Sequence, residues 1–154
     1  MIRITRQTDY GILLLSQMAS CPADEVHTAK HAAQKSRIPL PMASKILKAL
    51  AKGGLLVSHR GVKGGYSLAA AADRISIADV IQVLEGPIGI TECSFNPGSC
   101  EQEGFCPVQS NWQRINVAMR EALDKIPLSD MVVPPSHRPD VRFVSVSPQL
   151  ERRA

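Results

Sequence analysis

The sequence predicts a mainly α-helical chain that carries one small β-hairpin. Apolar residues recur at helical spacing in several segments that end at Gly or Pro, whereas residues 55–68 hold two short strand candidates around a glycine-rich tip. Aromatic residues make up only 4% of the 154-residue chain, so the core must be aliphatic, which suits packed helices. With 44% hydrophobic and 21% charged residues, the chain is expected to be globular.

Three helices are expected in the first part of the chain, over residues 5–19, 28–36 and 42–52. The connection between the second and third is tight, because Pro39 and Pro41 restrict the residues before them and Pro41 suits the first turn of a helix. Two short helices joined by a tight turn have the dimensions of a helix-turn-helix unit.

A basic hairpin follows this unit. Strands are expected over residues 56–59 and 66–68, with glycines between them that let the backbone turn sharply. Arg60 and Lys63 give the tip a positive charge. A hairpin placed after a helix-turn-helix unit is a wing, and a basic wing reaches for the neighbouring groove or phosphates. The fold class predicted is therefore a winged helix-turn-helix.

Charge is distributed unevenly along the chain. Residues 1–74 carry 11 Lys and Arg against 4 Asp and Glu, whereas residues 75–154 carry 7 against 10. A basic half is the electrostatic footprint of a surface that meets phosphate, although an ordinary solvated surface can look the same.

Five side chains are candidates for contact with double-stranded DNA. On the third predicted helix, Ser44, Lys45 and Lys48 lie off the apolar face and are expected to contact the groove. Arg60 and Lys63 are expected to contact phosphates or the minor groove. The alternative is a solvated basic face, which is the better interpretation for Lys52.

The second half is expected to hold a helix over residues 76–85, a loop over 88–107 and the longest helix over 108–126. Apolar residues recur along the longest helix at spacings of 4, 3, 4, 4 and 3, at Val108, Trp112, Ile115, Met119, Leu123 and Ile126. Such a stripe can lie on its own core, but the preceding domain is small, so a dimer seam is favoured.

These features divide the chain into three parts. Residues 1–74 form the winged helix-turn-helix DNA-binding domain, and residues 75–128 form a loop and a dimerisation helix. Residues 129–154, which are rich in Pro and scattered charges, are expected to be a flexible tail.

Three of the four cysteines lie close together in the predicted loop. Cys93, Cys100 and Cys106 are separated by gaps of six and five residues. In a reducing compartment, clustered thiols are more often metal ligands or redox centres than disulfides. The gaps are longer than those of a zinc knuckle. Spacing alone leaves three alternatives: an iron–sulfur cluster, a zinc ion or free thiols.

Several of these motifs resemble a family of winged-helix transcriptional regulators that includes the iron–sulfur regulator IscR and the nitric-oxide sensor NsrR. The similar stretches are the opening Ile2-Arg3-Ile4-Thr5 with Asp9-Tyr10-Gly11, the segment Lys45 to Leu50 with Gly54-Leu55-Leu56, the wing motif Arg60-Gly61 with Gly64 to Leu68, and the cysteine loop. The resemblance covers roughly residues 1–128.

The resemblance implies that Cys93, Cys100 and Cys106 hold an iron–sulfur cluster, 2Fe–2S in preference to 4Fe–4S. In NsrR-like members an acidic residue of the opening helix, at the position of Asp9, reaches across the dimer as fourth ligand. The chain departs from the pattern in its six-residue first gap and in Gln109, where IscR-like members often have histidine. The other candidates for the fourth ligand are Gln109, His31 and a residue of the partner chain.

The implied protein is a homodimeric DNA-binding regulator, most simply a repressor of iron–sulfur cluster assembly genes, acting on a pseudo-palindromic operator. The alternatives are a nitric-oxide or redox sensor of the same family and a zinc-stabilised DNA-binding protein without sensing. An enzyme is not expected, because the sequence has no nucleotide-binding glycine loop. No apolar run is long enough to span a membrane and no signal peptide is evident, so we expect a cytoplasmic protein.

Overall fold

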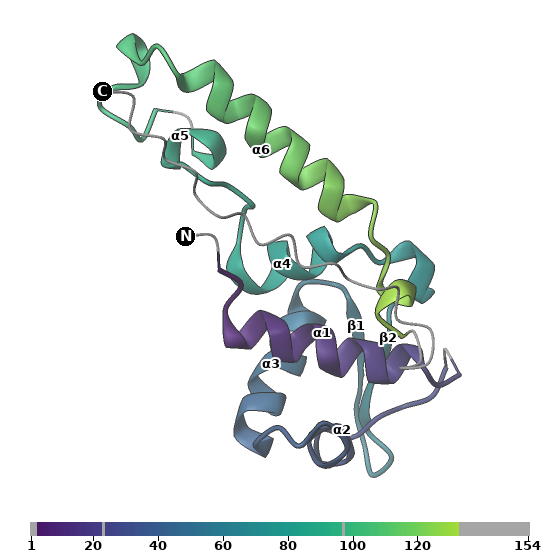
Figure 1. Cartoon of the computed structure of the whole chain (residues 1–154). Coiled ribbons are helices and arrows are strands. Elements are labelled where there is room, and N and C mark those ends of the chain that lie inside the picture. Colours follow the sequence, from purple (N-terminus) through teal and green to yellow (C-terminus); the bar gives the residue numbers. More distant parts are fainter. Residues whose placement is uncertain (1–2, 23, 97, 133–154) are drawn as a thin grey trace, which may run out of the picture.

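The computed structural model describes residues 3–22, 24–96 and 98–132 (Figure 1). The helices are α1 (Arg6–Ala19), α2 (Ala29–Ser36), α3 (Leu40–Lys52), α4 (Ile77–Glu85), α5 (Glu92–Phe95) and α6 (Gln109–Asp124). The strands are β1 (Leu56–His59) and β2 (Gly65–Leu68), and short 3-10 turns are η1 (Ala72–Arg74), η2 (Glu103–Phe105) and η3 (Leu128–Val132). The predicted fold class, mainly α with a small β wing, is confirmed.

Helix α1 forms the centre of the molecule, with α4 and α6 on one side and α2 and α3 on the other (Figure 1). The helix begins at Thr5, whose hydroxyl accepts a hydrogen bond from the backbone N–H of Thr8 at 3.3 Å. Leu14 and Leu15 are fully buried in the core. Helix α4 approaches α1 closely at Gly11, where any Cβ atom would overlap the side chain of Leu84.

Helices α2 and α3 form the predicted helix-turn-helix unit. Helix α2 is capped by Thr28, and the turn after it places Arg37 in the left-handed region with φ 56°. Helix α3 begins at Leu40, two residues before the predicted start, with Pro41 in its first turn. Its apolar face is completely buried against α1 and α4, at Ala43, Ile46, Leu47 and Leu50.

The wing is an antiparallel pair in which Leu56 lies opposite Leu68 and His59 lies opposite Gly65. The segment that precedes α2 also pairs with the wing, at strand β2. The N–H of His27 donates to the carbonyl of Tyr66 at 2.8 Å, and the N–H of Tyr66 donates back at 2.9 Å. The wing is thus hydrogen-bonded to the entrance of the helix-turn-helix unit.

The second half returns to the first through the end of α6. The N–H of Ile77 donates to the carbonyl of Ile126 at 2.9 Å, and the N–H of Leu128 donates to the carbonyl of Ile75 at 2.7 Å. Leu128 is fully buried, so the turn η3 is packed into the core under α1. Turn η3 occupies the first residues of the predicted tail, and residues 133–154 lie outside the described part of the chain.

Candidate DNA interface and cysteine loop

Helix α3 presents its polar face away from the core. Lys45 and Lys48 are exposed, and Ser44 is half-buried between them and the apolar face. Two apolar side chains at the start of the same helix are also exposed: Leu40 is 45% exposed and Met42 is 37% exposed. The sequence analysis did not select them as candidates for DNA contact. A helix with exposed Lys side chains, a half-buried Ser and exposed apolar side chains in its first turn can contact phosphates, base edges and thymine methyl groups.

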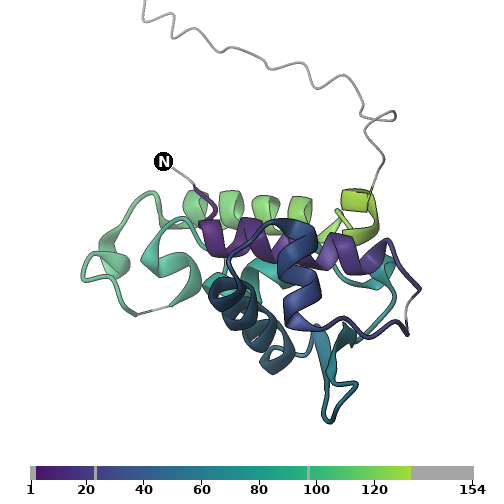
Figure 2. The same cartoon turned by 90° about the horizontal axis from the view of Figure 1, so that it is seen from below.

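The wing tip projects from the body of the protein (Figure 2). Arg60 and Lys63 are both exposed there, and Val62 between them is fully exposed. Gly61 has φ 102°, a conformation that side chains rarely adopt, so the tight turn depends on glycine. The arrangement places two cations at the far end of the hairpin, as the sequence predicted.

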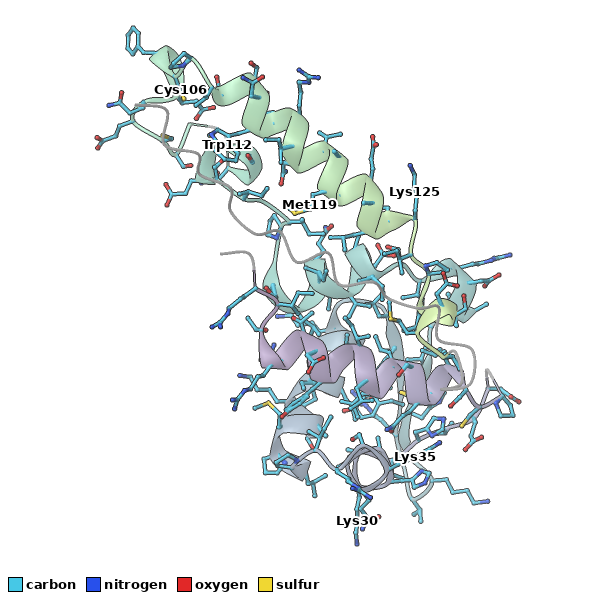
Figure 3. All side chains as sticks on the ribbon, in the orientation of Figure 1. Lys30, Lys35, Cys106, Trp112, Met119 and Lys125 are labelled. Atoms are coloured by element: carbon cyan, nitrogen blue, oxygen red, sulfur yellow. The ribbon has the colours of Figure 1, made fainter. Side chains whose placement is uncertain are left out.

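Helix α2 adds cations that the sequence analysis did not select for DNA contact. Lys30 extends from α2 away from the body of the molecule, on the side opposite α6, whereas the Nζ atom of Lys35 lies 3.8 Å from Cys21 Sγ at the end of α1 (Figure 3). In helix-turn-helix proteins the first helix crosses the phosphate backbone while the second enters the major groove. The position of Lys30 and Lys35 on the helix before α3 is the sequence feature that could have indicated a role in phosphate contact.

The cysteine loop lies at the other side of the molecule, at the N-terminal end of α6 (Figure 1). All its thiols are free. Cys93 is 9% exposed, and Thr91 Oγ1 lies 3.3 Å from its Sγ atom. Cys100 and Cys106 are half-buried. The predicted loop also contains the short helix α5, which carries Cys93, and the turn η2 before Cys106.

The carboxylate of Glu103 joins two parts of this loop by hydrogen bonds. Glu103 Oε2 accepts a hydrogen bond from the backbone N–H of Gly98 at 2.6 Å, and its Oε1 accepts one from Gln109 Nε2 at 3.0 Å. Gly98 has φ 84°, so this turn also favours glycine. The amide of Gln109 is therefore engaged with Glu103 rather than turned freely toward the cysteines.

Asp9 lies exposed in the first turn of α1. The start of this helix is tied to the end of α4, because the N–H of Thr5 donates to Glu85 Oε1 at 2.8 Å. Burial alone would raise the pKa of Glu85, but hydrogen bonds from Thr8 and Thr5 outweigh it and hold that pKa below its usual value.

The donor chemistry of the loop fits an iron–sulfur cluster, since three free thiols are the ligands such a cluster prefers and a fourth ligand is still needed. Within the described residues, the three cysteines and Asp9 do not form a group whose ligand atoms all lie within 4.8 Å of one another. Such a compact group occurs elsewhere, at Cys21, Glu25 and His27. The sequence analysis did not select these three residues as metal ligands.

The apolar stripe of α6 is divided between two environments. Toward its C-terminal end, Met119, Leu123 and Ile126 are half-buried, and Met119 points from α6 toward α4 (Figure 3). Toward its N-terminal end, Val108, Trp112 and Ile115 are 47%, 37% and 47% exposed. Half of the predicted seam is thus used within the chain, and half remains exposed.

The fold and its exposed basic surface define a winged helix-turn-helix DNA-binding protein. A family model described as "Rrf2: Iron-dependent Transcriptional regulator" matches residues 4–134. The chain belongs to this family, and is a DNA-binding transcriptional regulator. The resemblance expected from the motifs is thereby confirmed, as is the expectation that the protein is not an enzyme.

Relatives match over most of their length. Protein rrf2 of Nitratidesulfovibrio vulgaris is 28% identical over 131 residues, which are 85% of this chain and 87% of that protein. The HTH-type transcriptional regulator CymR of Bacillus subtilis is 29% identical over 130 residues, which are 84% of this chain and 89% of that protein.

Solved structures agree with the fold. CymR, the global cysteine regulator of B. subtilis, superposes with a TM-score of 0.66 at 30% identity, covering 86% of this chain and 97% of that one. IscR of T. potens has a TM-score of 0.64 at 27% identity, covering 85% of this chain and 86% of that one. Across the described residues, no helix combines the length and the apolar character needed to cross a membrane.

Proposed function

We propose that this regulator is a homodimeric repressor whose affinity for its operator depends on an iron–sulfur cluster held by Cys93, Cys100 and Cys106. The observation that carries the proposal is the position of three free thiols, buried or half-buried, on one loop directly before α6. The exposed apolar half of α6 lies beside this loop and offers a seam for a second copy.

Asp9 is the proposed fourth ligand, contributed by the second copy of the chain. Within the described residues of one chain, Asp9 and the loop cysteines do not form a compact donor group, so ligation by Asp9 requires the second copy. Gln109 is a weaker candidate because its amide is bonded to Glu103. Oxygen holds iron less strongly than thiolate does, so a cluster with one carboxylate ligand would be labile, as a sensor requires.

The wide loop favours a cluster, 2Fe–2S before 4Fe–4S, over zinc. A single zinc ion needs its donor atoms gathered closely around one point. The three loop sulfur atoms are not part of such a compact group in the described structure. A zinc-stabilised protein without sensing is therefore the weaker alternative.

Two copies would bind a pseudo-palindromic operator with their α3 helices in successive major grooves, about 34 Å apart. Lys45, Lys48 and Ser44 would contact the groove, and Arg60 and Lys63 the flanking phosphates or minor groove. A coupling of about 1–3 kcal/mol between the loop and the DNA surface would change operator affinity roughly 5- to 150-fold. The proposed targets are iron–sulfur cluster assembly genes; the Asp9 position equally suits a nitric-oxide or redox sensor.

The proposal is tested with protein purified anaerobically, by visible absorption, by iron and sulfide content, and by operator binding. Cys93→Ala, Cys100→Ala and Cys106→Ala should each abolish the visible absorption and shift operator affinity to that of the apoprotein. Cys21→Ala is the matched control, because Cys21 lies outside the loop, and it should retain the spectrum. An unchanged spectrum in all three loop variants would rule the cluster out.

A further inference from the structure

The segment between α1 and α2 gathers three potential metal ligands that the cysteine loop does not include. The ligand atoms of Cys21, Glu25 and His27 all lie within 4.8 Å of one another. They come from the spacing Cys-x3-Glu-x-His, which brings a thiol, a carboxylate and an imidazole together in one turn. Thiolate, carboxylate and neutral imidazole are the three ligand types of protein zinc sites.

The imidazole of His27 is buried, yet its nitrogen atoms have no hydrogen-bond partner among the described residues. His27 is only 5% exposed, and its Nε2 atom is buried with no hydrogen-bond partner among the described residues. Its Nδ1 atom lies 3.9 Å from Glu25 Oε1, too far for a hydrogen bond. A buried imidazole usually has its nitrogen atoms satisfied, and Nδ1, the nitrogen that lies near the Glu25 carboxylate, forms no hydrogen bond within the described residues and can therefore bind a cation.

We propose that Cys21 Sγ, a Glu25 carboxylate oxygen and His27 Nδ1 bind a single zinc-like divalent cation, with water as the fourth ligand. In a tetrahedral zinc site with bonds of about 2.0–2.3 Å, neighbouring ligand atoms are roughly 3.3–3.8 Å apart. The 3.9 Å between Glu25 and His27 is already close to this spacing. Exposed Glu25 and half-buried Cys21 can make the remaining adjustment with small side-chain movements.

The protonation state of His27 favours metal binding, whereas the charge of Lys35 opposes it. Burial lowers the pKa of His27, against the opposing effect of Glu25, so the imidazole is neutral and able to bind a metal at pH 7. Lys35 is the competing cation, since its Nζ atom lies 3.8 Å from Cys21 Sγ. Lys35 is exposed and long, so it can move aside when Cys21 binds the metal.

The site would couple metal binding to the DNA-binding elements. Thr28, the residue after His27, caps helix α2, and His27 itself is paired with Tyr66 of the wing. A cation that fixes His27 to the end of α1 would fix α2 and β2 with it. This centre is separate from the cysteine loop, and its existence does not depend on the proposed cluster.

The test uses the full-length protein and follows each cysteine separately by alkylation and mass spectrometry. With the wild type, Zn²⁺ is expected to slow alkylation of Cys21 at least about tenfold, because metal-bound thiolate is not free to react. Glu25→Gln should lose most of this protection, whereas Lys35→Gln, which removes the competing cation, should reach protection at lower Zn²⁺. An unchanged rate at Cys21, or equal protection in Glu25→Gln, would overturn the proposal.

A second measurement removes any contribution from the loop. In a variant with Cys93, Cys100 and Cys106 all replaced by Ser, Co²⁺ should produce the near-ultraviolet band of a thiolate–cobalt bond. Adding Cys21→Ser should abolish this band while the circular dichroism stays unchanged. A band that persists without Cys21, or no band in the loop variant, would contradict the site.

Discussion

His27 and Tyr66 are joined by two backbone hydrogen bonds, of 2.8 and 2.9 Å, so the entrance to α2 is a partner of wing strand β2. Gly65, the neighbour of Tyr66, makes this approach possible, because any Cβ atom there would overlap the backbone of His27. The helix-turn-helix and the wing are therefore held together through the main chain as well as through the core.

Gly65→Ala is expected to separate these two segments. The added methyl group would overlap backbone atoms of His27, which can move only together with the rest of their segment. We therefore expect a loss of about 1–3 kcal/mol in the free energy of unfolding, as for overpacked sites. Operator affinity should fall as well. Urea unfolding and fluorescence anisotropy measure the two effects. Gly104→Ala is the control, because a Cβ atom at Gly104 meets nothing within 4 Å; equal stability of the two variants would contradict the interpretation.

Stability is expected to fall as the pH is lowered through the titration of His27. Burial lowers the pKa of His27 from 6.5, with smaller contributions from His31 and Lys35 and an opposing one from Glu25. Between the folded and unfolded pKa values the unfolded chain binds more protons, so the free energy of unfolding rises with pH there and reaches its full value above 6.5. Urea unfolding of the metal-free protein at pH 7.5 and 5.5 should show this loss, and His27→Gln should reduce it. An identical pH dependence in both proteins would refute it.

Removal of single cations from the DNA surface should change the salt dependence of operator binding. Lys45→Ala and Arg60→Ala should each weaken binding and lower the slope of log affinity against log salt by about one, if each side chain contacts one phosphate. Lys125→Ala is the matched control, since Lys125 lies near the end of α6 on the opposite side of the molecule from α2 (Figure 3). A slope that is the same in all variants would remove Lys45 and Arg60 from the phosphate contacts.

The exposed end of the α6 stripe is predicted to hold the dimer together. Ile115→Asp places a charge on this surface and should convert the proposed dimer to a monomer, which sedimentation equilibrium would detect. Val117→Asp provides a close control, because Val117 is 54% exposed, against 47% for Ile115, but lies on another face of α6. Should Val117→Asp dissociate the dimer while Ile115→Asp does not, the seam lies elsewhere.

Two substitutions distinguish the candidate fourth ligands of the cluster. Asp9→Ala should make the visible absorption of anaerobic protein weaker and faster to decay in air, because a carboxylate ligand is lost. Gln109→Ala should leave the decay rate close to that of the wild type, because the Gln109 amide is bonded to Glu103. The reverse result would assign the ligand to Gln109.

Local chemistry made much of the fold predictable. The first helix begins at Thr5, which opens the predicted range, Pro41 lies in the first turn of α3 as expected, and the glycine-rich tip between β1 and β2 forms where the sequence placed it. The exposure of Lys45 and Lys48 followed from helical periodicity, and that of Arg60 and Lys63 from their position at the tip of the predicted hairpin. These features depend on neighbours within a few residues along the chain.

Features that depend on distant contacts were missed. The pairing of His27 with Tyr66 joins segments 39 residues apart, and no local pattern at either residue indicates it. Helix α5 is only four residues long, too short for periodicity to reveal. The compact group at Cys21, Glu25 and His27 depends on how the end of α1 turns toward α2, although the spacing itself was present in the sequence.

The anchoring of α6 has a mechanical consequence. Its C-terminal end is fixed to the winged domain by the bonds at Ile126 and Leu128, whereas its N-terminal end meets the cysteine loop about 24 Å away. A small displacement produced at the loop would therefore be smallest where α6 joins its own DNA-binding half. In the proposed dimer, a change at the loop would therefore reach the operator more directly through the second copy of the chain than along its own α6.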